Sequence, residues 1–314
     1  MDAANSILRA IAYFDVFRYP VTAGEIFLFM DRPISHAALC AELDHLLETK
    51  KIFRLGEYYS LQNEPGLEQR RILGNNRAMG LLLTAHRIGR TLYKFPFVRG
   101  VGISGSLSKN YADPDADIDY FIITSKNHLW IARTFLHALK KLSFLAGKQH
   151  WFCMNYFVDE EALLIAEKNV FTATEVVTLK PVCGAKGLQS FYNANLWAID
   201  YFPNHAPIAF AETRRKPFLV KSFLEKLMNN RLGNSIDNAL MRITAKRWAK
   251  KEENHQLNSK GNPLALIAGK HFARPNPEHF QKKIMNSVEE RIQRIENDVL
   301  SNESSAHFFR SEIM

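Results

Sequence analysis

GVGISGSLSKNYADPDADIDYFIIT, residues 100–124, carries the strongest structural signal in this chain. Its two ends are apolar and predict buried strands over 98–104 and 118–124, joined by a polar loop. The pattern that follows predicts a helix over 128–146 and a third strand over 150–158. This order of strand, loop, strand, helix and strand predicts a mixed α/β fold (α+β or α/β) built on one sheet.

Two carboxylates stand at the start of the second predicted strand. Residues two apart in a strand point to the same face, so Asp117 and Asp119 project together while Ile118 packs on the other side. Neighbouring carboxylates repel each other unless a cation lies between them. The pair therefore predicts a divalent-metal site, for Mg²⁺ or Mn²⁺, that is completed by substrate phosphates and water.

A glycine-serine turn precedes this pair in the same loop. Gly105 allows close backbone approach, and Ser106 with its neighbouring N–H groups can hold a phosphate near the metal. Ser108 and Lys109 follow directly and are further candidates for nucleotide binding. A phosphate site beside a carboxylate pair is typical of phosphoryl or nucleotidyl transfer.

Two other interpretations of the loop compete with this one. Gly100-x-Gly102-x-x-Gly105 matches a dinucleotide-binding fingerprint, but the segment between the strands is too short for the helix that such a site requires. The loop could also be a surface turn rich in Asp and Asn, without any ligand.

The Gly105-Ser106 turn followed by Asp117-x-Asp119 resembles the DNA polymerase β-like nucleotidyltransferase superfamily. More closely, it resembles bacterial nucleotidyltransferase-domain proteins with an N-terminal winged-helix segment. The main resemblance covers about residues 95–160, and a looser one extends to 171–176 and 192–204. It implies a nucleotidyltransferase-fold mixed sheet, a catalytic metal on both aspartates, and an NTP as substrate.

Active members of that superfamily usually carry a third carboxylate on a later strand. Asn155 stands at the expected position, and an amide cannot act as a base. Asp159 shares a strand face with Asn155 but lies four residues further along. The leading hypothesis is a Mg²⁺-dependent transfer of a nucleoside monophosphate to an unidentified acceptor. The alternative is a non-catalytic regulator that senses nucleotide and whose winged-helix module contacts protein or DNA.

Residues 1–63 predict three helices and a hairpin, as in a winged-helix-like domain. Thr22 and Glu25 have the spacing of a capping box, and Ser35 can cap the third helix. The region holds six basic and eight acidic residues. Since phosphate contacts dominate nucleic-acid affinity, this balance disfavours duplex DNA as a partner and favours a structural or protein-contact role.

The remaining regions are expected to be a core over 64–160 and a helical region over 161–314. Within 214–251 there are eleven basic residues against two acidic ones, and interleaved apolar residues predict an amphipathic helix. This basic stretch is open to three interpretations: a solvated helix face, a binding surface for RNA or another polyanionic acceptor, or a membrane-surface contact.

Composition limits the setting of the protein. The chain has 314 residues, a formal net charge of +9, 46% apolar residues and three separated cysteines without metal-site spacing. No signal peptide or transmembrane segment is evident, because Arg133, Lys140 and Lys141 interrupt the most apolar long stretch. These features predict a cytoplasmic protein with an anionic partner.

Overall fold

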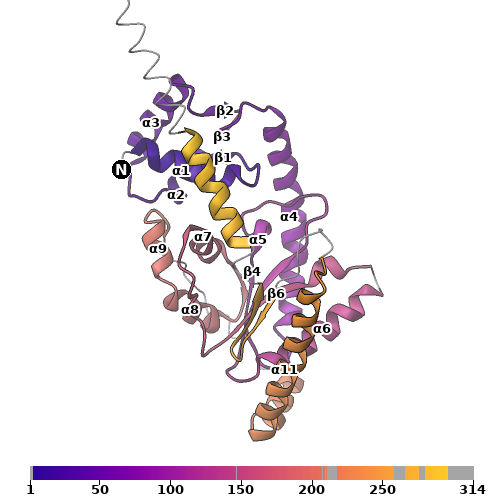
Figure 1. Cartoon of the computed structure of the whole chain (residues 1–314). Helices are drawn as coiled ribbons and strands as arrows, with labels where there is room; N and C mark the ends of the chain where they lie inside the picture. The colour runs from indigo at the N-terminus through magenta and orange to yellow at the C-terminus, as the bar shows by residue number, and fades with distance from the viewer. Residues whose placement is uncertain are drawn as a thin grey trace, which may run out of the picture. The chain divides into compact units, whose positions relative to one another are not determined.

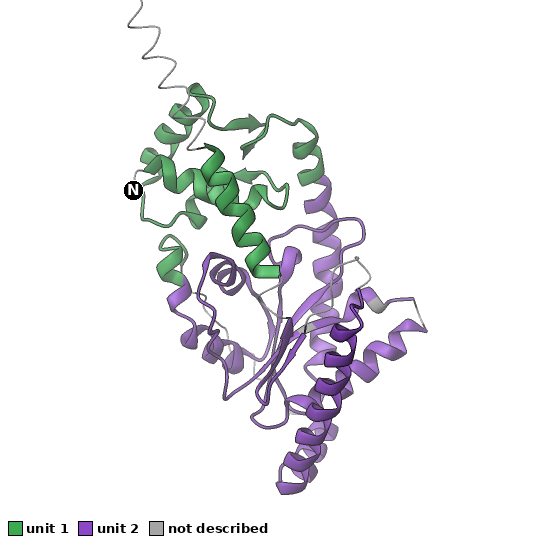
Figure 2. Cartoon of the chain, viewed as in Figure 1, with its two compact units in different colours: residues 1–72, 199–206, 278–314 green, residues 73–198, 207–277 purple. Residues whose placement is uncertain are grey.

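The computed structural model describes residues 3–145, 147–206, 208, 210, 218–257, 266–275 and 280–295, except for the side chains of Gln149 and Asn155. The chain forms two compact units, coloured separately in Figure 2. Unit 1 contains residues 1–72, 199–206 and 278–314, and unit 2 contains 73–198 and 207–277. The units interleave along the chain, whereas the regions expected from the sequence follow one another.

Unit 1 begins with three helices and a small antiparallel sheet (Figure 1). The helices are α1 (Ala3–Asp15), α2 (Ala23–Phe29) and α3 (His36–Glu48). The strands are β1 (Val21–Thr22), β2 (Phe53–Leu55) and β3 (Tyr58–Ser60), in the order β1-β3-β2. The predicted order of helices and hairpin is confirmed at the level of these elements.

Local signals set the starts of two of these helices. The Thr22 hydroxyl accepts from the Glu25 N–H at 3.1 Å, and the Glu25 carboxylate accepts from the Thr22 N–H at 2.9 Å. Ser35 caps α3 by accepting from the Ala38 N–H. Both predicted caps are confirmed, because each satisfies backbone donors that the first turn of a helix leaves without partners.

A C-terminal helix over 280–295 also belongs to unit 1, with Ile284 and Val288 buried. Its Arg291 Nε donates to the buried Asp15 carboxylate at 2.7 Å. The Gln62 amide donates to the same carboxylate at 3.0 Å. Three segments far apart in sequence therefore meet at one buried charge.

Unit 2 is built on a six-stranded mixed sheet in the order β7-β4-β5-β6-β9-β8. The strands are β4 (Val98–Ile103), β5 (Asp119–Thr124), β6 (Cys153–Asp159), β7 (Lys180–Cys183), β8 (Leu266–Ala268) and β9 (Phe272–Pro275). Among the described strands of this sheet, β5 and β6 pair in parallel and the other neighbours pair antiparallel. The expected mixed α/β architecture is confirmed at this level.

One face of the sheet packs on α4 (Gly66–Leu92) and α6 (Leu129–Phe144). Ile118, Tyr120 and Ile122 point into this core, and the Tyr120 hydroxyl donates to the Ala85 carbonyl oxygen at 2.9 Å. Burial of such side chains contributes about 1.5–3 kcal/mol each. Alternate residues of the second predicted strand therefore supply the core on this face of the sheet.

The opposite face is covered by α7 (Val170–Thr178) and α8 (Ala185–Ala194). The Phe121 ring packs on Phe191 of α8 with centroids 4.6 Å apart. A Cβ on Gly102 would lie 2.9 Å from Leu179 Cδ1, so the glycine lets the end of α7 pack closely on this strand. A short helix, α9 (Trp197–Tyr201), follows.

The region after residue 160 is not only helical, which corrects the expectation. It supplies β7, β8 and β9, and the short strands pair with β4 and β6 at both sides of the sheet. A stretch of three or four residues has too few positions to show a strand period in sequence. The predicted strand over 150–158 also begins later, after a short 3-10 helix, η1 (Gln149–Phe152).

Two further helices, α10 (Leu219–Met228) and α11 (Arg231–Glu253), carry the described part of the basic stretch, and α11 packs against α6. Arg214, Arg215 and Lys216 lie outside the described residues. Across the described parts of the chain, no helix combines the length and apolar character needed to cross a bilayer.

Candidate functional site

The predicted turn and carboxylates meet where β4 ends and β5 begins. The Ser104 N–H donates to the Asp119 carbonyl oxygen at 3.0 Å, and the four-residue helix α5 (Gly105–Ser108) follows. Gly105 has φ +67°, and a Cβ there would lie 2.6 Å from Asp119 Oδ2. The Gly105 backbone therefore lies directly against the Asp119 carboxylate, and a side chain at this position would strain the backbone and displace that carboxylate.

Asp117 and Asp119 are both half-buried, and Ile118 between them is fully buried. Both carboxylates lie near the Cys153 thiol on β6. Burial, together with the negative charges of Asp119 and Asp117, raises the pKa of Cys153 to about 12. The structure thus places both aspartates of the predicted pair at the start of β5, near the same thiol.

The polar residues after Gly105 differ in what they contact: one is exposed to solvent, and two donate hydrogen bonds to the turn itself. Ser106 is exposed. Ser108 is buried, and its hydroxyl donates to the Gly105 carbonyl oxygen at 2.8 Å. The Lys109 Nζ donates to the same carbonyl oxygen at 3.1 Å. Ser108 and Lys109 therefore hold the shape of the turn, and Ser106 is the serine that faces solvent.

Glu175 on α7 is a site residue that the sequence reasoning missed. Its Oε2 accepts from the Gly105 N–H at 3.3 Å, and its Oε1 lies 2.7 Å from the Lys109 Nζ. It is the only ionisable side chain in VFTATEVVT, residues 170–178. That isolated charge is the signal that could have drawn attention to it.

The residue expected at the third carboxylate position, Asn155, belongs to β6, which pairs with β5. In the β5–β6 ladder Asp119 pairs with Cys153, and Phe121 pairs with Tyr156. Asn155 lies in the irregularity between these pairs, and its side chain is outside the described residues.

Asp159 is not brought to the pair. It lies opposite Thr124, at the far end of the ladder from Cys153, since each residue advances a strand by about 3.3 Å. Its buried carboxylate accepts from the Asn127 and Glu161 N–H groups and contacts His271 Nδ1 at 2.8 Å. Asp159 organises the loop after β5 instead of the candidate site.

The other polar residues near the turn have different surroundings. Asp113 and Asp115 are exposed, and Asp113 accepts from the Tyr111 hydroxyl at 2.9 Å. His150 is also exposed, and its carbonyl oxygen accepts from the Ile118 N–H.

The donor set suits a cation that brings its own further ligands. Within the described ranges, no group of three or more His, Cys, Asp and Glu side chains is arranged to hold a metal ion. Mg²⁺ is often bound by one or two carboxylates plus substrate phosphates and water. Asp117 and Asp119, partly exposed beside a glycine turn, fit that kind of site.

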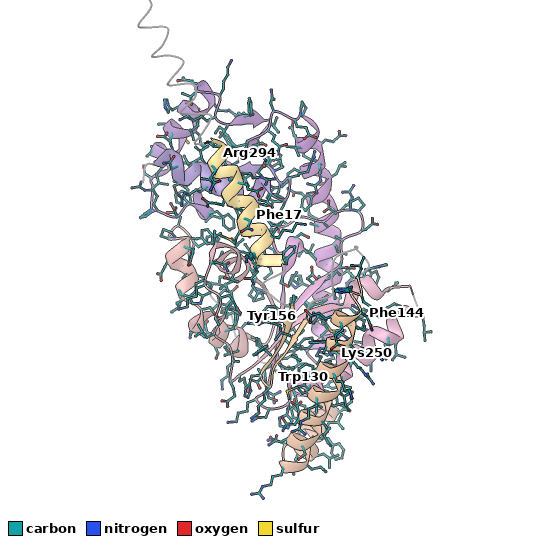
Figure 3. The ribbon with its side chains drawn as sticks, in the orientation of Figure 1. Phe17, Trp130, Phe144, Tyr156, Lys250 and Arg294 are labelled. Atoms are coloured by element: carbon teal, nitrogen blue, oxygen red, sulfur yellow. The ribbon has the colours of Figure 1, made fainter. Side chains whose placement is uncertain are left out.

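An aromatic and ionic cluster lies next along the same face of the sheet. Phe121, two residues after Asp119, packs on Tyr156 (labelled in Figure 3) with centroids 5.2 Å apart. Arg274 on β9 makes a two-pronged ion pair with Glu167, at 2.7 and 2.6 Å. Burial raises the pKa of Tyr156, so the phenol stays protonated beside this ion pair.

Comparison with protein-family models, with curated proteins and with solved structures finds no match for this chain.

Proposed function

We propose that this chain is a Mg²⁺-dependent nucleotidyltransferase that moves a nucleoside monophosphate from an NTP to an acceptor hydroxyl. The observation that carries the proposal is the contact of the Gly105 backbone with the Asp119 carboxylate, with Asp117 alongside. A phosphate held by the Gly105-Ser106 turn would lie next to the carboxylates that can bind a cation.

The reaction follows from that placement. Asp117 and Asp119 would hold Mg²⁺, which when bound supplies positive charge for the triphosphate. The acceptor oxygen forms a bond to the α-phosphorus, the bond between that phosphorus and the bridging oxygen breaks, and pyrophosphate leaves. The acceptor proton passes to solvent. The nearby Glu175 carboxylate is not used as the base, because it already accepts from the Gly105 N–H and pairs with Lys109. The turn residues Gly105 and Ser106 hold and orient the phosphates.

Calorimetry tests the site directly. The double variant Asp117→Asn with Asp119→Asn should abolish Mg²⁺-dependent NTP binding, because the amides remove both negative charges. Asp115→Asn is the matched control, since Asp115 is an exposed acid of the same loop. Unchanged nucleotide affinity in the double variant would show that the site is assigned wrongly.

One observation favours the second candidate, a non-catalytic nucleotide sensor. The residue in register with Asp119 is Cys153, a buried thiol whose raised pKa keeps it protonated at neutral pH. Such a thiol cannot act as a general base. In this version the site binds nucleotide without turnover, and the N-terminal helices and sheet contact protein or DNA.

Incubation with α-labelled NTPs, Mg²⁺ or Mn²⁺ and cell extract separates the two candidates. Transfer of label to a product or to the chain itself supports the enzyme, provided that it is lost in the Asp117→Asn, Asp119→Asn variant. Metal-dependent binding without any transfer supports the sensor.

A further inference from the structure

Charged residues of helix α10 hold it against the rest of unit 2. The Lys221 Nζ donates to the carbonyl oxygens of Tyr93 and Val98, at 2.8 and 2.6 Å. The Glu225 carboxylate receives two hydrogen bonds from Arg99, at 2.8 and 3.1 Å. The polar side of this helix therefore faces the protein and is fixed there.

The opposite side of α10 presents large apolar side chains to solvent. Leu219, Val220, Phe223 and Leu227 are 82%, 60%, 67% and 61% exposed. At 100° per residue these four positions cover one continuous stripe, here called the α10 face. A surface helix ordinarily buries its apolar stripe, so this reversed arrangement marks an interaction surface.

Exposed basic residues accompany the α10 face in the described part of the chain. Lys94, Lys226 and Arg231 are exposed, and the Lys94 Nζ lies 5.8 Å from the ring centroid of Phe218. The two acids within 218–251 are turned inward. Glu225 pairs with Arg99 as described, and Asp237 is 3% exposed and accepts from the Ile131 N–H at 2.8 Å.

The basic series continues along α11. The exposed residues Arg242, Lys246, Arg247, Lys250 and Lys251 follow one another there, and Lys250 is labelled in Figure 3. No carboxylate within the described residues 218–251 offsets these charges at the surface.

We propose that the α10 face docks unit 2 on an anionic lipid bilayer, with α10 lying in the interface. Apolar side chains flanked by Lys and Arg are the combination that such helices use. Three of the four side chains are aliphatic, which suits acyl chains better than nucleic-acid bases, which bind by stacking on aromatic rings. A second copy of the chain is disfavoured, since a symmetric contact would bring two basic rims together. This proposal is independent of the proposed transferase activity.

Co-sedimentation with vesicles tests the proposal on the full chain. Two vesicle types are used, phosphatidylcholine alone and phosphatidylcholine mixed equally with phosphatidylglycerol. We expect binding to the mixed vesicles, weakened by added salt, and at least about tenfold weaker binding after Phe223→Ser with Leu227→Ser. The matched control is Leu142→Ser with Leu145→Ser, since these leucines at the end of α6 are 63% and 88% exposed. It should bind as the parent chain does.

Three results would overturn the proposal. The first is absence of binding to the mixed vesicles, and the second is equal loss in both double variants. The third is that Phe223→Ser with Leu227→Ser leaves vesicle binding intact but abolishes another interaction. That interaction would be concentration-dependent dimerisation, measured by sedimentation equilibrium, or binding of single-stranded RNA. Thermal unfolding of each variant shows that the exposed substitutions leave the fold intact.

Discussion

At Gly105 the chain adopts a left-handed backbone with φ +67°, against the carboxylate of Asp119. The turn is held from within, because Ser108 and Lys109 both donate to the Gly105 carbonyl oxygen. From outside, Glu175 accepts from the Gly105 N–H. One residue thus contacts the candidate metal site, the turn and α7 together.

Gly105→Ala tests the importance of this contact. The added methyl group should cost about 1 kcal/mol of unfolding free energy from backbone strain, and about as much again from displacement of the Asp119 carboxylate. Metal-dependent nucleotide affinity should fall at least about tenfold. Gly147→Ala is the matched control, because Gly147 has φ +62° and nothing within 4 Å of a built Cβ. Chemical denaturation measures the free energy of unfolding, and calorimetry measures the nucleotide affinity. An equal loss of nucleotide affinity in Gly105→Ala and Gly147→Ala would contradict the predicted role of Gly105.

Glu175→Gln tests the carboxylate that occupies the Gly105 N–H. A negative charge there repels a phosphate, so its removal should strengthen nucleotide binding about three- to tenfold. Glu161→Gln is the control, since it also removes the acid of a Lys–Glu pair, with Lys126 at 3.2 Å. Weaker nucleotide binding in Glu175→Gln would show instead that the carboxylate positions Lys109 for the phosphate.

At the scale of elements, α6 depends on a residue from α11 for its first turn. Asp237 Oδ1 accepts from the Ile131 N–H at 2.8 Å, satisfying a donor that the helix start leaves without a partner. Burial raises the pKa of Asp237 to about 6, while hydrogen bonds from Ile131 and Trp130 and the charge of His128 oppose that rise.

The raised pKa gives a stability prediction with a definite sign. Between the ordinary value of 3.8 and about 6 the folded chain holds more protons at Asp237 than the unfolded chain does. The stability that this group contributes is therefore present at low pH and is lost as the pH rises through that window. Asp237→Asn should remove this loss, because the amide does not titrate.

The free energy of unfolding of the two proteins, measured between about pH 4 and about pH 7, should diverge in favour of Asp237→Asn as the pH rises. Parallel curves would show that Asp237 titrates normally.

At the scale of the whole molecule, an ion pair between Asp15 and Arg291 joins segments near the two ends of the described chain. Asp15 closes α1, and Arg291 lies in the helix over 280–295. Both belong to unit 1, although 276 residues separate them in sequence.

Arg291→Ala should leave the buried Asp15 carboxylate with Gln62 as its described side-chain partner and lower the stability of unit 1 by about 2 kcal/mol. Hydrogen exchange in residues 280–295 should then become faster. Arg294→Ala is the control, because Arg294 (labelled in Figure 3) is an exposed residue of the same helix. Equal protection in both variants would contradict the predicted anchoring role.

Much of the architecture could be predicted from local patterns in the sequence. Some features depend on residues that are neighbours in the chain, so they can be predicted before the fold is known. They are the caps formed by Thr22 with Glu25 and by Ser35, and the burial of Ile118 between two half-buried aspartates. The Gly105 turn and the aspartate pair are likewise predicted from residues close together in the chain. β7, β8 and β9 could not be found, because strands this short are stabilised by their partners in the sheet.

The order of the main elements, the two caps in unit 1 and the apolar character of β5 follow from the sequence, since these depend on periodicity and local hydrogen bonding. The contact of Glu175 with Gly105, the position of Cys153 opposite Asp119 and the position of Asp159 far along the ladder are visible in the folded chain alone. The outward orientation of the apolar side of α10 is visible there too. Strand register and helix orientation depend on contacts between residues distant in sequence, and those contacts form only when the chain is folded.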